Sequence, residues 1–217
     1  MFITKFKMAN LVTYMGVVSS VFAIYYAYMY ETKWAYICLI ISGVCDMLDG
    51  MFARRFKRTD EEREIGIQMD SLCDVASFLI VPIAIYISMG LDQWFSFIFY
   101  AVYIVCGITR LGYFNVYANE HKGEVLKVYR GLAVTYASLI YPVSLIVIHL
   151  LNTYILKPSS MPLYSQTCLI YALHLAIMLS MSLLFMLDIP IPKPGKKGYI
   201  FYAVLAIVAI GTIVILF

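Results

Sequence analysis

Seven apolar stretches, each about as long as a bilayer is thick, take up most of the chain. A helix needs about 20 apolar residues to cross the hydrocarbon layer. The stretches lie at 9–30, 34–54, 66–89, 93–117, 130–152, 165–187 and 198–217. Hydrophobic residues make up 63% of the 217 residues and the mean hydropathy is +0.84, which excludes an ordinary soluble domain. The sequence therefore predicts an all-α, polytopic membrane helix bundle with seven transmembrane helices.

The remaining segments are short, and none of them is expected to form a soluble domain. Residues 1–8 mix apolar residues with two lysines and are expected to lie along the membrane interface. The polar segments 55–65 and 118–129 are predicted to be cytoplasmic turns, and the proline-rich segment 189–195 a stiff linker. We therefore expect one membrane-embedded domain, 1–217, with 198–217 as an additional C-terminal helix.

Basic residues are distributed unevenly between the two sides of this arrangement. Of the 16 lysines and arginines, all but Lys33 and Lys157 fall on the side of the N-terminus. Because loops rich in Lys and Arg tend to stay in the cytoplasm, the N-terminus is expected to be cytoplasmic and the C-terminus outside. The second stretch ends and the third begins on that cytoplasmic side.

A cluster of aspartates lies near the cytoplasmic ends of the second and third stretches. The pattern is Asp46-x-x-Asp49-Gly50-x-x-Ala53-Arg54, then residues 55–65, then Gly66-x-x-x-Asp70-x-x-x-Asp74. Helical residues separated by three or four positions share a face. The first half of the pattern therefore forms one stripe, and the second half, extended by Ser77, forms another. These two stripes are predicted to face each other across one cleft.

The aspartates are costly in an apolar bundle unless something compensates their charge. A charged side chain costs ~2.5–3.5 kcal/mol at the centre of a span, and neighbouring carboxylates also repel each other. Divalent cations would remove both costs, and all-carboxylate sites suit Mg²⁺ or Mn²⁺ better than zinc. The five cysteines and three histidines have no useful ligand spacing and are interpreted as packing residues. The sequence thus predicts a magnesium or manganese site.

Small residues share the two stripes with the aspartates. Gly50, Ala53 and Gly66 leave room for a ligand to approach the helix backbone. The same residues equally suit close packing between membrane helices, and by themselves they do not separate the two interpretations. Beside the aspartates, the ligand interpretation is preferred.

The complete aspartate pattern resembles the signature of the CDP-alcohol phosphotransferase family, integral membrane enzymes of phospholipid synthesis. Segment 55–65 is longer than the spacer usual in that family, so the local path of this turn is expected to differ. The resemblance implies that an acceptor hydroxyl attacks a CDP-activated lipid and that CMP leaves, with two divalent cations, Mg²⁺ or Mn²⁺, bound at the site. It also implies a homodimer.

Roles for individual residues follow from the resemblance. Asp46, Asp49 and Asp70 would suffice as metal ligands, and Asp74, the fourth carboxylate of the metal site, is the expected base for the acceptor hydroxyl. The residues expected to contact the nucleotide or CDP-lipid are Asn10, Thr13, Asp49, Gly50, Ala53, Arg54 and Gly66. Capping of the first helix explains Asn10 and Thr13 equally well.

Three further segments are similar to the phosphatidylserine synthase branch of that family. They are Asp70–Phe78 with Pro82 beyond it, Thr109–Asn115, and Tyr129–Thr135, in which Ala133 replaces the usual proline. This similarity implies CDP-diacylglycerol, or an ether-lipid analogue, and L-serine as substrates. The residues expected near the acceptor are Ser77, Arg110, Asn115 and Arg130.

Other interpretations remain open at this point. Arg110 would pair with the carboxylate of serine, but it would equally extend to lipid headgroups, as arginines near helix ends commonly do. Glycerol 3-phosphate, inositol phosphate or another alcohol is an alternative acceptor. A cation-coupled membrane transporter is the alternative from a different class, because carboxylates in spans also relay ions. Membrane lipids are expected partners, and nucleic acid is not.

Overall fold

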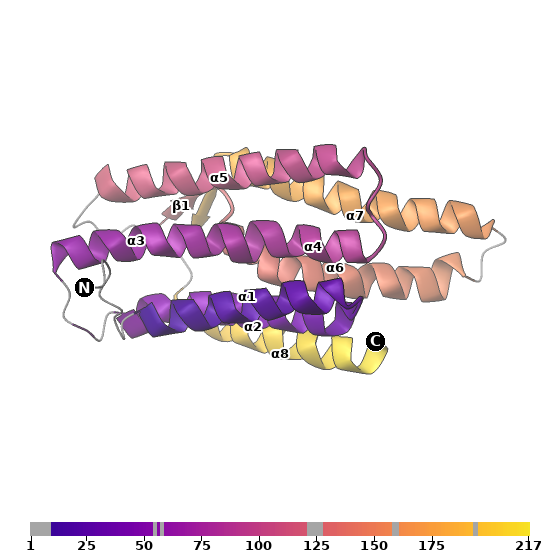
Figure 1. Cartoon of the computed structure of the whole chain (residues 1–217), viewed down its shortest axis with the longest axis horizontal. Coiled ribbons are helices and arrows are strands. Elements are labelled where there is room, and N and C mark those ends of the chain that lie inside the picture. Colours follow the sequence, from indigo (N-terminus) through magenta and orange to yellow (C-terminus); the bar gives the residue numbers. More distant parts are fainter. Residues whose placement is uncertain (1–9, 54–55, 57–58, 121–127, 158–160, 193–194) are drawn as a thin grey trace.

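The computed structural model of the chain is a bundle of long helices that run side by side (Figure 1). It describes residues 10–53, 56, 59–120, 128–157, 161–192 and 195–217, without the side chains of 118–120, 128–130, 192, 196 and 197. The predicted interfacial segment 1–8 and Arg54 lie outside this part of the chain. Within it, seven helices are long and apolar enough to cross a membrane. The predicted all-α membrane bundle is therefore confirmed.

The helices follow each other in simple order along the chain. The elements are α1 (Leu11–Tyr28), α2 (Thr32–Ala53), α3 (Asp60–Asp74), the π-helix η2 (Val75–Ile80), α4 (Val81–Ser88), α5 (Ser96–Glu120), β1 (Val128–Arg130), the 3-10 helix η3 (Val134–Tyr136), α6 (Ala137–Leu151), the π-helix η4 (Asn152–Leu156), α7 (Leu163–Met186), β2 (Pro190–Pro192) and α8 (Lys196–Leu216). The segments α3, η2 and α4 form one continuous span, 60–88. In Figure 1, α1 begins at one end of the bundle and α8 finishes at the other.

Exposed aromatic residues mark one end of the bundle. Tyr28, Tyr30, Trp94, Tyr154 and Tyr164 are all at least 74% exposed, and each lies at or near a turn joining α1 to α2, α4 to α5, or α6 to α7. Tyrosine and tryptophan concentrate where a bilayer meets water. These side chains therefore fit the membrane interface at the end of the bundle opposite the connection from α2 to α3.

Small residues bring α1 and α2 close together. The buried residues of α1 are Gly16, Ser20, Ala23 and Ala27, at the spacing that lets membrane helices approach each other. A Cβ atom on Gly16 would lie 3.2 Å from Cys45 Cβ on α2. This close contact places the N-terminal turns of α1 beside the aspartates of α2.

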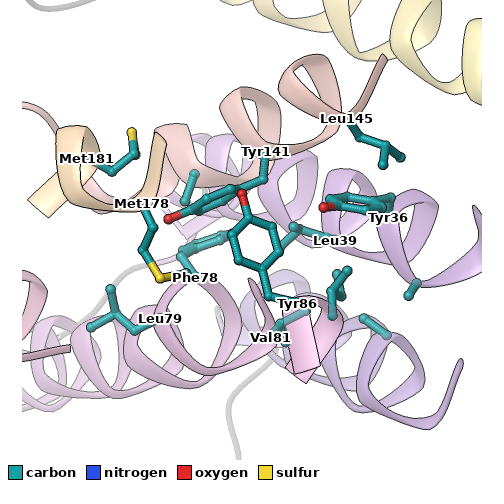
Figure 2. Packing of buried hydrophobic residues seen from close by; sticks show 14 of the residues in the cluster. Tyr36, Leu39, Phe78, Leu79, Val81, Tyr86, Tyr141, Leu145, Met178 and Met181 are labelled. Carbon is teal, nitrogen blue, oxygen red and sulfur yellow. The ribbon is translucent and has the colours of Figure 1, made fainter. Parts of the chain in front are cut away.

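Aromatic side chains pack together with aliphatic ones and methionines in the buried core of the bundle (Figure 2). Tyr86 packs edge-on against Tyr141, with ring centroids 5.4 Å apart, and against His174, at 5.2 Å. Such edge-to-face pairs are favourable beyond the area that they bury. Tyr36 of the same cluster lies on α2, two to three turns before Asp46. Phe78 lies on η2, about one turn after Asp74. The core therefore closes the bundle beyond the aspartate cluster.

Pro82 leaves one helical carbonyl without its usual donor, and another helix supplies a replacement. A proline has no backbone N–H and cannot bond the carbonyl four residues before it, which here belongs to Phe78. The Tyr103 hydroxyl of α5 donates to the Phe78 carbonyl at 2.7 Å. The backbone polar group is thus satisfied inside the apolar bundle, as a membrane span requires.

The third span begins earlier than the sequence predicted. Residues 60–65 were expected to form a turn, but α3 starts at Asp60. Thr59 and Glu62 form a capping box, in which Glu62 N donates to Thr59 Oγ1 and Thr59 N donates to Glu62 Oε2. This arrangement satisfies two donors of the first helical turn and extends the helix beyond its apolar part. The predicted turn is wrong over these residues.

Two short strands form where the sequence predicted the end of the turn 118–129, the first residue of the span 130–152 and the linker 189–195. β1 pairs antiparallel with β2, with Tyr129 opposite Ile191, and Gly131 N donates to the Ile189 carbonyl at 2.8 Å. Gly131 has φ +78°, a conformation that favours glycine, so the chain turns there and α6 begins at Ala137 instead of at 130. The predicted turn 118–129 is likewise helical over 118–120.

The orientation of the bundle remains a prediction that labelling can test. In a variant without the native cysteines, Glu61→Cys is expected to react with an impermeant thiol reagent only from the cytoplasmic side, and Lys157→Cys only from outside. Both side chains are exposed, at opposite ends of the bundle. Labelling of both positions from one side of sealed vesicles would contradict the seven-helix topology.

Candidate active site

The four aspartates of the sequence pattern come together between α2 and α3. One carboxylate oxygen from each of Asp46, Asp49 and Asp70 lies within 4.8 Å of the others, close enough to hold a metal ion. Asp74 is one turn deeper along α3 than Asp70 and interacts with Asp46. The two predicted stripes therefore do face each other.

A threonine from a third helix fixes part of this cluster. The Thr13 hydroxyl of α1 donates to Asp49 Oδ2 at 2.8 Å. Asp49 and Asp74 are buried, whereas Asp46 and Asp70 are only partly buried. A carboxylate that is held by a neighbouring hydroxyl presents a fixed orientation to a cation, which is how residues around a metal site support its ligands.

The donor set suits a hard divalent cation. It consists of carboxylate oxygens alone, the ligands preferred by Mg²⁺ and Mn²⁺, and the oxygens are already close together. No helix has to move to bring them into range. The residues therefore fit the divalent-metal site that the sequence predicted.

A cavity of about 870 Å³ opens beside two of these aspartates. Asp46, Asp49 and Gly50 are among its lining residues. Within the described part of the chain, no atom outside the neighbouring backbone of α2 lies within 4 Å of the position that a Cβ on Gly50 would take. Most of the remaining lining is apolar and comes from α6 and α8, with Ile177 from α7. A ligand in the cavity could therefore approach the backbone at Gly50, and the predicted contact of Gly50 with a ligand stays a prediction.

The other described residues predicted to contact the nucleotide do not line this cavity; they are Asn10, Thr13, Ala53 and Gly66. Ala53 is buried and is not among the residues that line the cavity. The Asn10 amide lies 3.7 Å from Met69 Sδ and makes no side-chain bond that caps α1. Gly66 is half-buried, one turn before Asp70. Arg54 lies outside the described residues.

Ser77 belongs to a buried group of serines below the aspartates. Ser20 Oγ lies 2.7 Å from Ser77 Oγ and 2.9 Å from Ser42 Oγ, so the three hydroxyls join α1, α2 and η2. All three residues are at most 3% exposed. These contacts satisfy polar groups at a helix junction, and the predicted contact of Ser77 with an acceptor stays a prediction.

Arg110 is bonded to the segment that follows β1. Its Nε donates to the Leu132 carbonyl at 3.1 Å and its Nη2 to the Gly131 carbonyl at 3.2 Å. The residue is 6% exposed and lines a separate cavity of about 290 Å³ with Asp188. Arg110 therefore connects α5 to the turn before α6 and does not extend to lipid headgroups.

Asn115 of α5 is hydrogen bonded to α3, the helix that carries Asp70. Its Nδ2 donates to Ser71 Oγ at 2.8 Å, and Ser71 directly follows Asp70. Arg130 is in β1, opposite Pro190, and its side chain is outside the described part of the structure. Asn115 thus contacts a sequence neighbour of Asp70, and its predicted contact with the acceptor stays a prediction.

Two tyrosines of α8 line the cavity and were not predicted. Tyr199 and Tyr202 lie on its wall, and the Tyr202 and Ser138 hydroxyls are hydrogen bonded to each other. Ser138 and Tyr202 are 64 residues apart in the sequence. No local spacing in the sequence indicates this contact, because it depends on how α8 packs on α6.

The described residues form seven helices of membrane-spanning length, and two of these helices carry a cluster of carboxylates. These features define an integral membrane protein with a site suited to a divalent metal. The chain belongs to the CDP-alcohol phosphatidyltransferase family, whose match extends over residues 6–178. This membership confirms the resemblance that the aspartate pattern predicted. The last helix, α8 (Lys196–Leu216), lies beyond the matched range.

Several curated proteins are similar to part of the chain. CDP-diacylglycerol–serine O-phosphatidyltransferase of Saccharomyces cerevisiae is 37% identical over 78 residues, which are 36% of this chain and 27% of that protein. Archaetidylserine synthase of Methanothermobacter thermautotrophicus is 35% identical over 89 residues, 41% of this chain and 38% of that protein. CDP-diacylglycerol–serine O-phosphatidyltransferase of Helicobacter pylori strain J99 is 33% identical over 113 residues, 51% and 46% respectively. The matches thus span less than half the length of each relative.

The bond from Thr13 to Asp49 can be tested through metal affinity. Thr13→Val keeps the shape of the side chain but removes its hydroxyl, so we expect the affinity for Mn²⁺ to fall about 10- to 100-fold. Thr13→Ser retains the hydroxyl and should bind Mn²⁺ nearly as the unmodified protein does. Titration calorimetry on the purified protein measures both. Thr167→Val, on an exposed face of α7, is the control, and equal affinities in all variants would disprove a supporting role for Thr13.

Proposed function

We propose that the protein transfers a phosphatidyl group from CDP-diacylglycerol, or from an ether-lipid analogue, to L-serine and releases CMP. The observation that carries this proposal is the group of Asp46, Asp49 and Asp70 oxygens within 4.8 Å of one another. Membership of the CDP-alcohol phosphatidyltransferase family supports the reaction type. The names of the similar proteins support serine as the acceptor.

The proposed reaction exchanges one bond at phosphorus for another. The serine hydroxyl oxygen attacks the phosphorus that carries the lipid, while the bond from that phosphorus to the CMP oxygen breaks and CMP takes the electron pair. Asp74 accepts the proton of the attacking hydroxyl. Two divalent cations, Mg²⁺ or Mn²⁺, held by Asp46, Asp49 and Asp70, would neutralise the diphosphate. The products are a serine phospholipid and CMP.

The remaining residues would bind and orient the substrates. The open space beside Gly50 gives the CDP group access to α2, with Asn10, Thr13, Ala53, Arg54 and Gly66 as proposed neighbours. Asn115, through its contact with Ser71, supports an acceptor position near Asp70. Ser77, Arg110 and Arg130 complete the proposed acceptor group.

The proposed setting follows from the membrane topology. The distribution of basic residues favours an active site that faces the cytoplasm, where CDP-lipid headgroups and serine meet. We further propose one functional domain, 1–217, and a homodimer, as the family resemblance implies.

Acceptor choice is the first test of this function. Purified protein with CDP-diacylglycerol and Mn²⁺ is expected to release CMP faster with L-serine than with glycerol 3-phosphate, myo-inositol or choline. Arg110→Lys keeps the charge but loses the planar guanidinium, so the KM for serine should rise more than that for CDP-diacylglycerol.

Three results would contradict parts of this account. Faster release with glycerol 3-phosphate would overturn serine as the acceptor but leave the CDP-lipid chemistry in place. A proportionate change in both KM values would indicate that Arg110 acts only by holding the Gly131–Leu132 turn. Absence of CMP release with every acceptor would favour a cation-coupled carrier.

The division of roles among the aspartates is the second test. Asp74→Asn is expected to retain Mn²⁺ and CDP-lipid binding while turnover falls by ~10²–10⁴, because a general base is lost. Asp46→Asn should also weaken Mn²⁺ binding, since Asp46 belongs to the ligand group. Calorimetry and CMP release measure the two effects separately. An equal loss of Mn²⁺ affinity in both variants would show that the roles are assigned wrongly.

A further inference from the structure

The cavity beside the aspartates has two chemically different parts. Asp46 and Asp49 supply carboxylates at one end, and the walls of α6 and α8 supply mainly apolar side chains such as Leu139, Val143 and Leu205. The apolar wall on α6 extends from Leu139 to Ile148, about 14 Å at 1.5 Å per residue. A molecule that fills this space must carry both a cation-binding group and a long apolar group.

The outer wall of the cavity is formed by α8, which lies beyond the residues matched by the family. Tyr202 holds this helix in place through its hydroxyl contact with Ser138 on α6. Both side chains pack over Gly43 of α2, where a Cβ atom would overlap Ser138 and lie 2.7 Å from the Tyr202 hydroxyl. A glycine at 43 is therefore needed for α2, α6 and α8 to meet at this point.

The cavity also has an opening toward the surroundings of the bundle. Phe201 lines it and is 69% exposed, so this part of the wall faces the lipid phase. An apolar chain can extend from the carboxylate end, along α6, and past α8 into the bilayer. The occupant that fits these features is a hydrocarbon chain of the CDP-linked lipid.

We propose that α8 selects the hydrocarbon chain of the lipid donor, with Leu205 as a wall of the chain site and Tyr202 as a positioning residue that keeps α8 against α6. This inference rests on the proposed function for the identity of the donor. It adds a specificity-determining element from outside the family match. The width of the cavity between α6 and α8 then limits which chains bind.

Filling the cavity tests the proposal by binding. Leu205→Trp is expected to weaken binding of CDP-dipalmitoylglycerol at least about tenfold relative to CDP-glycerol, which has the same headgroup without chains. Binding is measured by equilibrium competition on the full chain in lipid nanodiscs with Mn²⁺. Ile207→Trp is the control, because it adds a tryptophan on the exposed side of α8, where Ile207 is 69% exposed. It should leave the ratio of the affinities for CDP-dipalmitoylglycerol and CDP-glycerol unchanged.

A second variant tests the position of α8 without adding bulk. Tyr202→Phe keeps the ring but loses the contact with Ser138, so discrimination between CDP-dipalmitoylglycerol and CDP-dioctanoylglycerol should decrease. Ser138→Ala also removes the Tyr202 contact, together with the donation from Ser138 Oγ to the Thr135 carbonyl at 2.7 Å. The discrimination should therefore decrease in Ser138→Ala, and adding Tyr202→Phe to Ser138→Ala should decrease it no further, because the shared contact is already lost. Thermal unfolding in nanodiscs identifies variants that fail to fold.

The outcomes separate this inference from the proposed function. Two results together would overturn the role of α8 even if CMP release is normal. They are an unchanged ratio of the affinities for CDP-dipalmitoylglycerol and CDP-glycerol in Leu205→Trp, and unchanged discrimination between CDP-dipalmitoylglycerol and CDP-dioctanoylglycerol in Tyr202→Phe. Selective loss of the chain-bearing ligand in Leu205→Trp would support it. If the unmodified protein releases no CMP with any acceptor, the proposed function fails, while the binding ratios still decide where the chain lies.

Discussion

The bundle is organised around carboxylates that cannot be placed cheaply in an apolar environment. Asp46, Asp49, Asp70 and Asp74 are held together by two helices, and α1 adds the hydroxyl of Thr13. Because a charged group in a span costs several kcal/mol without compensation, such a cluster persists only where cations or hydrogen bonds offset it. The small residues of α1, the serine group and the aromatic core all keep these helices at the separation that the cluster needs.

The parts of the fold that could be predicted depend on local spacing. Apolar stretches of span length gave the seven helices, and the three- and four-residue spacing of the aspartates placed them on facing stripes. The start of α3 was also readable, because Thr59-Asp60-Glu61-Glu62 is a capping-box sequence. Hydropathy places the start of the span at residue 66 because Asp60–Glu64 are all charged, although they form the first turns of the same helix.

Contacts between distant segments could not be predicted in the same way. β1 and β2 pair across about sixty residues, and Arg110 finds its acceptors on the backbone of Gly131 and Leu132. In both contacts, the local sequence of one segment does not indicate which distant segment it will meet. The Tyr202–Ser138 contact has the same origin, since it exists only once α6 and α8 have packed over Gly43.

The π-helix η2 sets the angular relation between the two halves of the third span. Each residue of an α-helix advances the face by about 100°, and a π-turn accommodates one additional residue. Asp70 and Asp74 before η2 face the carboxylate cluster, whereas Leu79, Ile85 and Tyr86 in η2 and after it face the aromatic core. Deleting one residue from η2 would leave both halves helical but rotate one half by about 100° relative to the other. The aspartates could then no longer face the carboxylate cluster while the later residues face the aromatic core. The irregular turn thus acts as a phase adjustment within a single helix.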